Sequence, residues 1–463
     1  MDPTEIAFAG AAEQGRMLAA GAITAPQLLD LHLERIARLD HQLGAFRVVL
    51  DGEARAEAAA AQARLDAGER APLLGVPVAI KDDADVAGQT TAWGTSAHGP
   101  AKTADAEVVR RLRAAGAVVV GKTNVPEMTI WPFTESLTFG ATRNPWDLSR
   151  TPGGSSGGTA AAVAAGLVPL GLGSDGGGSI RIPATWCGLF GLKPQRDRVP
   201  LAPHDGAWQG LSVNGPLART VEDAALFLDA TADDLPEGGF AAAVRQAPGR
   251  LRIAMSAKLP PGVLGRVGRA QRAAFGEAAA LLRELGHDVV QRDPDYPLDG
   301  AAAQFMPRYL RGIRDDVATM PHPELLEART RAMARLGGLV SDRRIGAVRA
   351  AEAAFTARVT SIFDDVDVLL TPGAATGPPR VGAYQRRGAV GTFNRIAGRV
   401  PFQPIWNATG QPAAVVPWGL DGDGLPLSVQ LVGRPHGEAT LLGLGAQVEA
   451  ARPWAARRPE YGR

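Results

Sequence analysis

The sequence contains too little of several residue types to support some common classes of protein. It has 463 residues but one cysteine, Cys187, which excludes a disulfide framework within the chain and a thiolate metal site. Lys and Arg total 49 and Asp and Glu total 48, so the formal net charge is +1. This balance lacks the basic excess that binding to nucleic-acid phosphates requires, and we expect no nucleic-acid partner.

The sequence also lacks a long hydrophobic run and a leader segment. Its longest uncharged stretch, between Arg150 and Asp175, holds two prolines and many small residues, which is typical of a loop and a buried helix rather than a membrane span. The first ten residues, MDPTEIAFAG, carry two acids and no basic region before an apolar stretch, unlike a signal peptide. We expect a cytoplasmic protein that does not enter a membrane.

The hydrophobic patterning indicates an α/β protein with a large core. Hydrophobic residues make up 45% and charged residues 21% of the chain, ordinary proportions for a globular fold. Short apolar runs alternate with helical patterns and predict a large mixed β-sheet covered by helices on both faces. We expect strands near residues 73–80, 117–120, 167–172, 252–255, 289–290, 366–370, 413–416 and 427–432.

Nothing in the sequence marks a boundary between domains. There is no linker, internal repeat or charge block, and we therefore predict a single domain over residues 1–463. Residues 235–345, rich in Arg, Ala and Pro, are the least patterned and are predicted to form an insertion or lid. Residues 70–230 and 346–463 would then form the core. The sequence leaves open whether the protein forms a homodimer.

Two motifs match a known spacing but not the chemistry behind it. Residues 116–123 (GAVVVGKT) have the spacing of a phosphate-binding loop, but three valines favour a strand and Pro126 follows closely. Residues 153–157 (GGSSG) have the spacing of an α/β-hydrolase nucleophile elbow, but no clear strand leads into them. We therefore predict neither a nucleotide site nor that elbow.

The histidines and the cysteine offer little for catalysis or metal binding. The seven histidines lack metal-ligand spacing and are interpreted as surface or hydrogen-bonded core residues. Cys187 lies in the apolar segment TWCGLFG and is interpreted as a buried structural thiol rather than a nucleophile. We expect no metal and no cofactor.

Several separate segments agree on one chemistry, nucleophilic catalysis by a serine. Lys81 ends an apolar run, Ser155 and Ser156 stand between glycine pairs, and Ser179 follows three consecutive glycines. Glycines in such a run let successive backbone N–H groups point the same way and bind an oxyanion. A buried, neutral lysine can act as the base, and a second serine can pass the proton to it.

These segments resemble the amidase signature family of serine hydrolases. The resemblance covers most of the chain and rests on motifs that occur in order. The motifs are GVPVAIKD at 75–82, GKTNVPE at 121–127, NPW at 144–146, TPGGSSGG at 151–158, DGGGSIRIP at 175–183, CGLFGLKP at 187–194, NATGQP at 407–412 and the segment 427–437.

The resemblance implies a catalytic role for three side chains. Ser179 would be the nucleophile that forms the acyl-enzyme. Ser155, expected after a cis peptide bond, would be the bridging serine, and Lys81 would be the base. The sequence predicts that Asp82 and Asp83, beside Lys81, point away from it, because a facing carboxylate would favour the charged lysine.

The resemblance also implies the surroundings of these side chains. The N–H groups of Gly176, Gly177, Gly178 and Ser179 would form the oxyanion hole. The side chains that would hold this loop are Ser156, Asp175 and Arg181. For Asp175 and Arg181, a plain buried ion pair remains an equal alternative to a direct catalytic role. Lys122 is interpreted as structural or solvated.

The substrate pocket is expected along one short segment. Met128, Thr129, Ile130 and Trp131 would border it, and the bulky apolar residues at 131–133 are consistent with an aryl or alkyl substrate. Simple core packing is the alternative interpretation of the same residues.

The resemblance predicts an amidase that hydrolyses C–N bonds of small amides, with anilides, esters and carbamates (urethanes) as further candidate substrates. The alternative is a glutamine-hydrolysing amidotransferase component that works in a complex. Ile182 and the segment QRDRV after Pro194 depart from the usual amidotransferase pattern. A binding protein that has lost catalysis is disfavoured, since the predicted lysine and both serines are intact.

Overall fold

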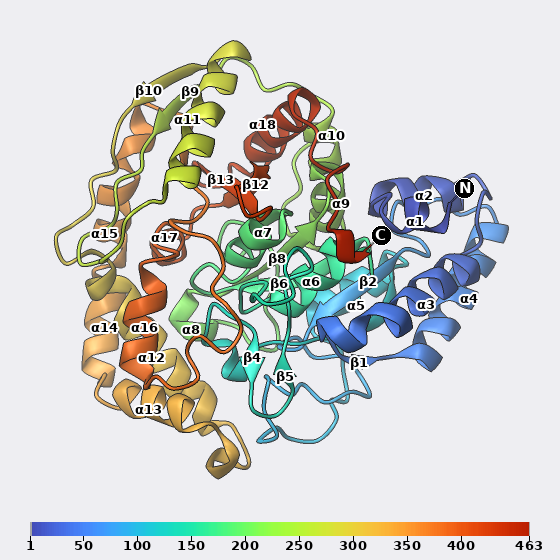
Figure 1. Cartoon of the computed structure of the whole chain (residues 1–463), viewed down its shortest axis with the longest axis horizontal. Helices are drawn as coiled ribbons and strands as arrows, with labels where there is room; N and C mark the ends of the chain where they lie inside the picture. The colour runs from blue at the N-terminus through green and yellow to red at the C-terminus, as the bar shows by residue number, and fades with distance from the viewer. Residues whose placement is uncertain (1, 463) are drawn as a thin grey trace.

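An eleven-stranded mixed β-sheet runs through the computed structural model, which describes residues 2–462 (Figure 1). In sheet order its strands are β1 (Phe46–Val49), β3 (Val118–Thr123), β2 (Pro77–Lys81), β6 (Leu170–Asp175), β8 (Val213–Ala218), β7 (Phe190–Lys193), β12 (Ala413–Leu420), β13 (Pro426–Gly433), β11 (Val368–Pro372), β9 (Arg252–Met255) and β10 (Asp288–Gln291). Two short strands, β4 (Glu135–Ser136) and β5 (Gly140–Ala141), pair separately.

The apolar runs account for most of these strands. Each run predicted to be a strand overlaps one in the structure. Three strands of the main sheet, β1, β7 and β8, were not predicted, nor were the short strands β4 and β5. The sequence of β8, VNGPLA, contains Asn, Gly and Pro, which are depleted in strands, so its pairing with β6 and β7 depends on tertiary context.

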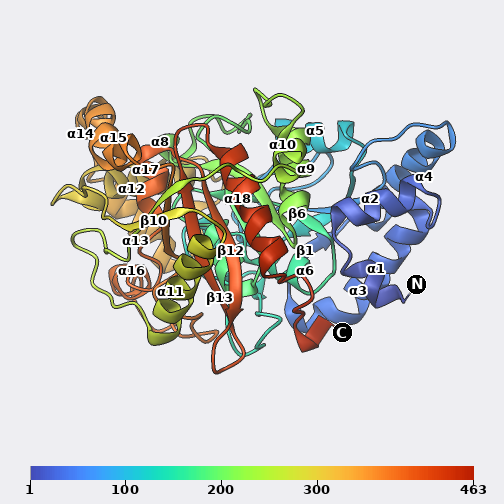
Figure 2. The same ribbon diagram turned by 90° about the horizontal axis from the view of Figure 1, so that it is seen from above.

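The sheet is covered on both faces. Every residue of β2, β3, β7, β8, β11 and β13 is buried, which requires helices or loops above and below the strands. Figure 2 shows helices on either side of the strands. The predicted fold class, a large mixed sheet between helical layers, is therefore confirmed.

Eighteen α-helices and four short 3₁₀ helices (η) occur within residues 2–462. They are α1 (Pro3–Ala7), α2 (Ala11–Ala19), α3 (Ala25–Leu43), α4 (Asp51–Asp66), α5 (Glu107–Ala114), η1 (Glu127–Thr129), α6 (Gly157–Ala164), α7 (Arg181–Cys187), α8 (Ala207–Gly210), α9 (Val221–Thr231), α10 (Phe240–Val244), α11 (Arg269–Glu284), α12 (Gly300–Ala318), η2 (Pro323–Leu325), α13 (Ala328–Gly337), α14 (Asp342–Ala350), α15 (Glu352–Thr360), η3 (Ser361–Asp364), α16 (Ala389–Ala397), α17 (Pro404–Thr409), α18 (Glu438–Ala451) and η4 (Glu460–Gly462).

The strand directions bring two predicted site residues to one edge of the sheet. Strand β2 pairs in parallel with both β3 and β6. The carboxyl ends of neighbouring parallel strands meet at the same edge. Lys81, the last residue of β2, and Asp175, the last residue of β6, therefore lie at a common edge.

The segment 235–345 contributes both to the sheet and to its cover. Strands β9 and β10 come from this segment and form one margin of the main sheet. Helix α12, from the same segment, packs on α8, α13 and α17. The segment is thus continuous with the core, and the extent of a lid within it stays a prediction.

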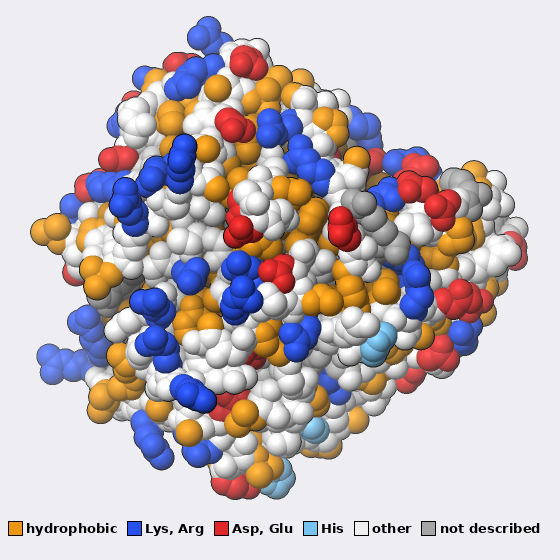
Figure 3. Space-filling model, viewed as in Figure 1, with side chains coloured by type: hydrophobic (Ala, Val, Ile, Leu, Met, Phe, Trp, Pro, Cys, Tyr) orange, Lys and Arg blue, Asp and Glu red, His pale blue; other side chains and the backbone are white. Residues whose placement is uncertain are grey.

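The two ends of the chain lie on the same side of the molecule (Figures 1 and 2). Arg458 pairs with Glu5 at 2.5 Å, and the Tyr461 hydroxyl donates a hydrogen bond to the Leu39 carbonyl oxygen. On the face shown in Figure 3, basic, acidic and hydrophobic side chains are interspersed. Of the helices within residues 2–462, none is both long enough and apolar enough to cross a bilayer.

Candidate active site

Lys81 is held in a fully buried position at the end of β2. Its side chain is 0% exposed, and its Nζ donates to Ser155 Oγ at 2.8 Å and to Ser174 Oγ at 2.6 Å. Burial lowers the pKa of Lys81 below its ordinary value, although Asp83 and Asp175 oppose this shift. Lys81 is therefore in hydrogen-bond contact with Ser155, as the base role implied by the resemblance requires.

The two carboxylates after Lys81 take opposite directions, and the prediction that both point away is half wrong. Asp82 points away and pairs with Arg47 and Lys122 at 2.6 and 2.9 Å. Asp83 instead lies 3.0 Å from Lys81 Nζ and accepts a hydrogen bond from the Ser174 hydroxyl. A turn closed by the bond from the residue 84 amide to the Lys81 carbonyl oxygen returns Asp83 toward the lysine.

The two serines after the first glycine pair are both buried. The peptide bond between Gly154 and Ser155 is cis, as the resemblance implies. The Ser155 hydroxyl accepts from Lys81, while the Ser156 hydroxyl accepts from the Ser174 amide and donates to the Ser174 carbonyl oxygen. The Ser156 amide donates to the Ser179 carbonyl oxygen at 3.2 Å. Ser156 thus joins the two serine-bearing segments.

The glycine run after β6 leaves several backbone donors available. Within residues 2–462, the amides of Gly176, Gly177 and Ser179 donate to no other group. The Gly178 amide differs from the prediction, because it donates to Asp175 Oδ1 at 2.6 Å. Of the four amides that the resemblance implies for an oxyanion hole, the Gly178 amide is thus engaged and the other three have no hydrogen-bond acceptor in residues 2–462. The Ser179 hydroxyl, half-buried, is without a hydrogen-bond partner in the described chain.

A buried ion pair fixes this loop from behind. Asp175 and Arg181 are both 0% exposed, and Arg181 Nε lies 2.9 Å from Asp175 Oδ2. Asp175 also accepts bonds from the amide of Ile180 and from Asn407 Nδ2. Burial acts to raise the pKa of Asp175, but Arg181 and Asn407 hold it well below its ordinary range. The charges face one another and not the cavities, which favours the ion-pair interpretation.

Two cavities meet at Ser179. The larger has a volume of about 340 Å³ and is lined mainly by apolar side chains. The smaller has a volume of about 60 Å³ and has more polar walls. Ser179, Thr129 and Trp208 line both, whereas Ser155 lines only the smaller. The nucleophile candidate therefore stands between an apolar and a polar compartment.

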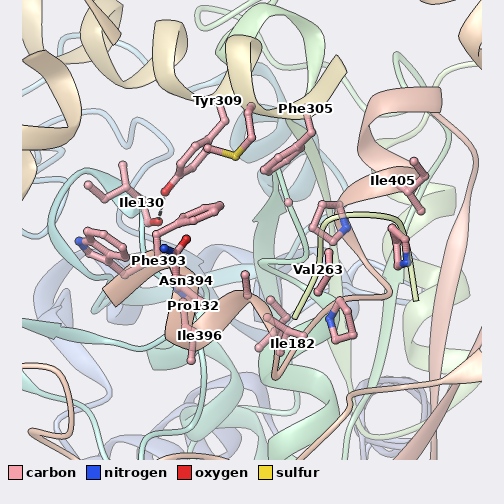
Figure 4. A pocket seen from close by; sticks show the side chains of 18 of the residues that line it. Ile130, Pro132, Ile182, Val263, Phe305, Tyr309, Phe393, Asn394, Ile396 and Ile405 are labelled. Carbon is pink, nitrogen blue, oxygen red and sulfur yellow. Dashed lines mark hydrogen bonds between the residues drawn. The ribbon is translucent and has the colours of Figure 1, made fainter. Parts of the chain in front are cut away.

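Distant segments supply the walls of the larger cavity (Figure 4). Phe305 and Tyr309 approach from α12, and the Tyr309 hydroxyl donates to the Ile130 carbonyl oxygen at 2.6 Å. Phe393 approaches from α16 and Ile405 from α17. None of the residues of the described chain that line this cavity carries a charge.

Three of the four residues predicted to border a substrate pocket line one of the two cavities. Thr129, Ile130 and Trp131 line the larger cavity. Met128 does not line it, and this part of the prediction is wrong. Met128 is 0% exposed and packs in the hydrophobic core, where its backbone has a φ of 53° and its amide donates to the Trp93 carbonyl oxygen. The tight turn at this position directs neighbouring side chains to different sides.

The remaining interpretations concern buried groups outside the cavities. Cys187 is buried, its thiol donates to the Pro152 carbonyl oxygen, and burial raises its pKa. Lys122 is also buried and bonds to Asp82, to the backbone of residue 90 and to Thr91, so it is structural rather than solvated.

Sequence reasoning missed several residues around Ser179. Ser174, whose hydroxyl accepts a hydrogen bond from Lys81, was not singled out, although it follows Gly173 and stands directly before Asp175 at the end of β6. Asn407, which holds Asp175, was quoted only as part of a motif. The aromatic walls from α12, α16 and the turn at Trp208 carried no local signal of a cavity.

Comparison with known proteins agrees with this geometry. The Amidase family model matches residues 27–442. A Mycobacterium tuberculosis (strain H37Rv) protein with the provisional name amidase AmiB2 is 69% identical over 99% of each chain. A glutamyl-tRNA(Gln) amidotransferase chain from Roseiflexus castenholzii is 35% identical over 97% of each chain. The solved structure of 6-aminohexanoate cyclic dimer hydrolase is 29% identical, with a TM-score of 0.88 and 99% of each chain covered. The chain therefore belongs to the amidase signature family and is an amidase that acts on C–N bonds.

Proposed function

We propose that the protein hydrolyses small linear amides with an apolar acyl group, through an acyl-enzyme on Ser179. The observation that carries this proposal is the 2.8 Å hydrogen bond between the buried Lys81 Nζ and Ser155 Oγ, beside Ser179 and three available amides. The apolar cavity of about 340 Å³ next to Ser179 supports the acyl preference.

The relay accounts for both halves of acylation. Neutral Lys81 takes a proton from Ser155, and Ser155 takes the Ser179 proton as Oγ attacks the carbonyl carbon. The oxyanion is stabilised by the amides of Gly176, Gly177 and Ser179. When the C–N bond breaks, Ser155 gives a proton to the leaving nitrogen and recovers one from Lys81. Hydrogen bonds of this kind often tighten only in the complex with substrate.

Deacylation repeats the relay with water in place of Ser179. Water loses a proton to Ser155 and attacks the ester carbon, and the Ser179 oxygen leaves with a proton. Because only the acyl group remains on the enzyme, esters of the same acids are also substrates of this mechanism. Anilides and carbamates would follow the same route, the latter through a carbamoyl-enzyme.

The walls of the larger cavity favour this function over glutamine hydrolysis in an amidotransferase complex. Glutamine carries an ammonium and a carboxylate group, and burying either without a charged or hydrogen-bonding partner is costly. The described residues lining the cavity carry no charge. A free-standing hydrolase of apolar acyl compounds fits these walls better.

Amine release by the purified protein tests the proposal. The substrates are 3-phenylpropanamide, glutamine, a p-nitroanilide and an aryl carbamate, each with the wild type and with Ser179→Ala. We expect turnover of the phenylpropanamide that is lost in the variant, and no turnover of glutamine. Hydrolysis of glutamine alone, or turnover that survives Ser179→Ala, would refute the proposal.

A further inference from the structure

The relay fixes which cavity receives which half of the substrate. Ser155 must protonate the leaving nitrogen, so that nitrogen must lie on the side of Ser179 that Ser155 faces. Ser155 lines the smaller cavity and not the larger one. If the proposed acyl-enzyme mechanism holds, the acyl group therefore enters the larger cavity and the amine enters the smaller one.

The smaller cavity limits the size of the amine. Its volume is about 60 Å³, well below that of a cavity of about 150 Å³ that binds one benzene molecule. Ammonia or a methylamine-sized group fits this space, and an aniline does not. The larger cavity, at about 340 Å³, can hold an aromatic ring with an alkyl chain.

One wall of the smaller cavity presents a carboxylate. Asp316, on α12, accepts a hydrogen bond from Trp208 Nε1 on its Oδ2 atom at 2.7 Å. Within residues 2–462, no other group donates to the Asp316 carboxylate. His204 lines the same cavity, but its Nε2 lies 3.7 Å from Asp85 Oδ2 and faces that carboxylate. The Asp316 oxygen that Trp208 leaves free therefore offers an acceptor to a group that carries N–H donors.

We propose that Asp316 is a specificity-determining residue that binds the leaving amine and directs the enzyme toward primary amides and amides of methylamine-sized amines. Its free carboxylate oxygen accepts an N–H bond from the amine. When Ser155 protonates the nitrogen, positive charge develops on it before the C–N bond breaks, and the carboxylate stabilises this charge; the bond electrons then return to the nitrogen and the neutral amine leaves. An ester oxygen has no N–H and gains less from the same carboxylate.

The test compares four compounds with the same 3-phenylpropanoyl group: the primary amide, the N-methylamide, the anilide and the methyl ester. The N-methylamide and the methyl ester have leaving groups of equal size, and only the former has an N–H. Burial raises the pKa of Asp316 to about 6, so assays at pH 8 keep it ionised. kcat/KM is measured for the wild type and for Asp316→Asn, which can still accept from Trp208.

We expect the wild type to cleave the primary amide at least tenfold faster than the anilide. Asp316→Asn should lower kcat/KM for the primary amide and the N-methylamide by about ten- to a hundredfold, the value of one hydrogen bond to a charged group. The methyl ester should change by less than about threefold. Asp315→Asn is the matched control: Asp315 is the adjacent residue, pairs with Arg311, and lines neither cavity.

A second variant tests the size limit without removing the carboxylate. Leu201 lines the smaller cavity and is only partly buried, so Leu201→Ala should fold and enlarge the space. We expect it to raise kcat/KM for the anilide relative to the primary amide.

The outcomes separate this inference from the proposed function. Equal losses on amides and ester in Asp316→Asn, or an anilide cleaved as fast as the primary amide by the wild type, would overturn the role of this cavity while leaving the mechanism intact. A wild type that hydrolyses neither amide nor ester would overturn the proposed function, and this inference with it.

Discussion

Replacing Asp175 by Asn should destabilise the protein because it leaves Arg181 buried without a counter-charge. Both side chains are 0% exposed, and the carboxylate also accepts bonds from the Gly178 and Ile180 amides and from Asn407. Breaking a buried ion pair by removing one partner lowers the free energy of unfolding by about 3–5 kcal/mol.

The expected change in melting temperature follows from the chain length. An unfolding entropy of about 2.1 cal/mol/K per residue gives about 1 kcal/mol/K for 463 residues. Each kcal/mol therefore shifts Tm by about 1 °C, and Asp175→Asn should lower Tm by about 3–5 °C. The Gly178 amide would also lose a charged acceptor, which loosens the loop that carries the oxyanion donors. The complete loss of one oxyanion donor lowers kcat by about a hundredfold or more. Because the loop is loosened and not removed, we expect Asp175→Asn to lower kcat by no more than about a hundredfold.

Calorimetry and amide hydrolysis by the same preparations provide the assay. Asp30→Asn is the control, because Asp30 pairs with Arg55 at the surface, where both side chains are about half exposed, and such pairs contribute less than about 1 kcal/mol. The double variant Asp175→Asn, Arg181→Met should recover part of the lost stability, since no unpaired buried charge remains. A Tm loss equal to that of Asp30→Asn, or strictly additive effects in the double variant, would refute the reasoning.

The stability that Asp175 contributes should depend on pH in a defined direction. The folded-state pKa of Asp175 is lowered, so its stabilisation is present above the unfolded value of about 3.9 and is lost as the pH falls through the lower folded value. The difference in Tm between the wild type and Asp175→Asn should therefore be full at neutral pH and shrink under strongly acidic conditions.

Three further predictions concern the proposed base Lys81, the apolar cavity and the cysteine. Asp83→Asn removes a carboxylate 3.0 Å from Lys81 Nζ and should lower the pKa of Lys81, which moves the acid limb of the kcat/KM–pH profile to lower pH. Asp82→Asn should leave that limb in place, because Asp82 pairs with Lys122 instead. An acid limb that stays fixed in both variants would contradict the role of Lys81 as the base. Phe305→Ala should raise KM for 3-phenylpropanamide by about three- to tenfold and leave acetamide hydrolysis within twofold, whereas equal effects on both would indicate general disruption. Iodoacetamide should modify no cysteine in the native protein and one after denaturation, because Cys187 is 1% exposed and burial raises its pKa. Rapid labelling of the native protein with loss of activity would contradict the structural role of Cys187.

Local sequence predicted the candidate reacting groups at the centre of the site. An apolar run that ends in lysine places Lys81 at a strand end, and glycines beside Ser155 and Ser179 allow the close backbone approach that the site needs. The same apolar runs predicted most of the central strands, because a strand buried on both faces is usually rich in apolar residues. These features depend on neighbours in the chain and can be recognised there.

Tertiary structure alone decided where the surrounding side chains point. Asp82 and Asp83 are adjacent acids in the sequence, and only the turn after β2 separates one from Lys81 and brings the other to it. The Gly178 amide is engaged because Asp175 folds back beneath the loop. Met128 enters the core because the backbone turns sharply at that residue.

The cavities were also decided by tertiary structure. Their walls combine η1, the glycine loop, α12, α16 and α17, segments that lie far apart along the chain. Aromatic residues such as Phe305 have the same helical spacing whether they fill a core or line a cavity, so no local pattern distinguishes the two. The sequence by itself determined the candidate reacting groups, whereas the packing of distant helices determined the space on either side of Ser179.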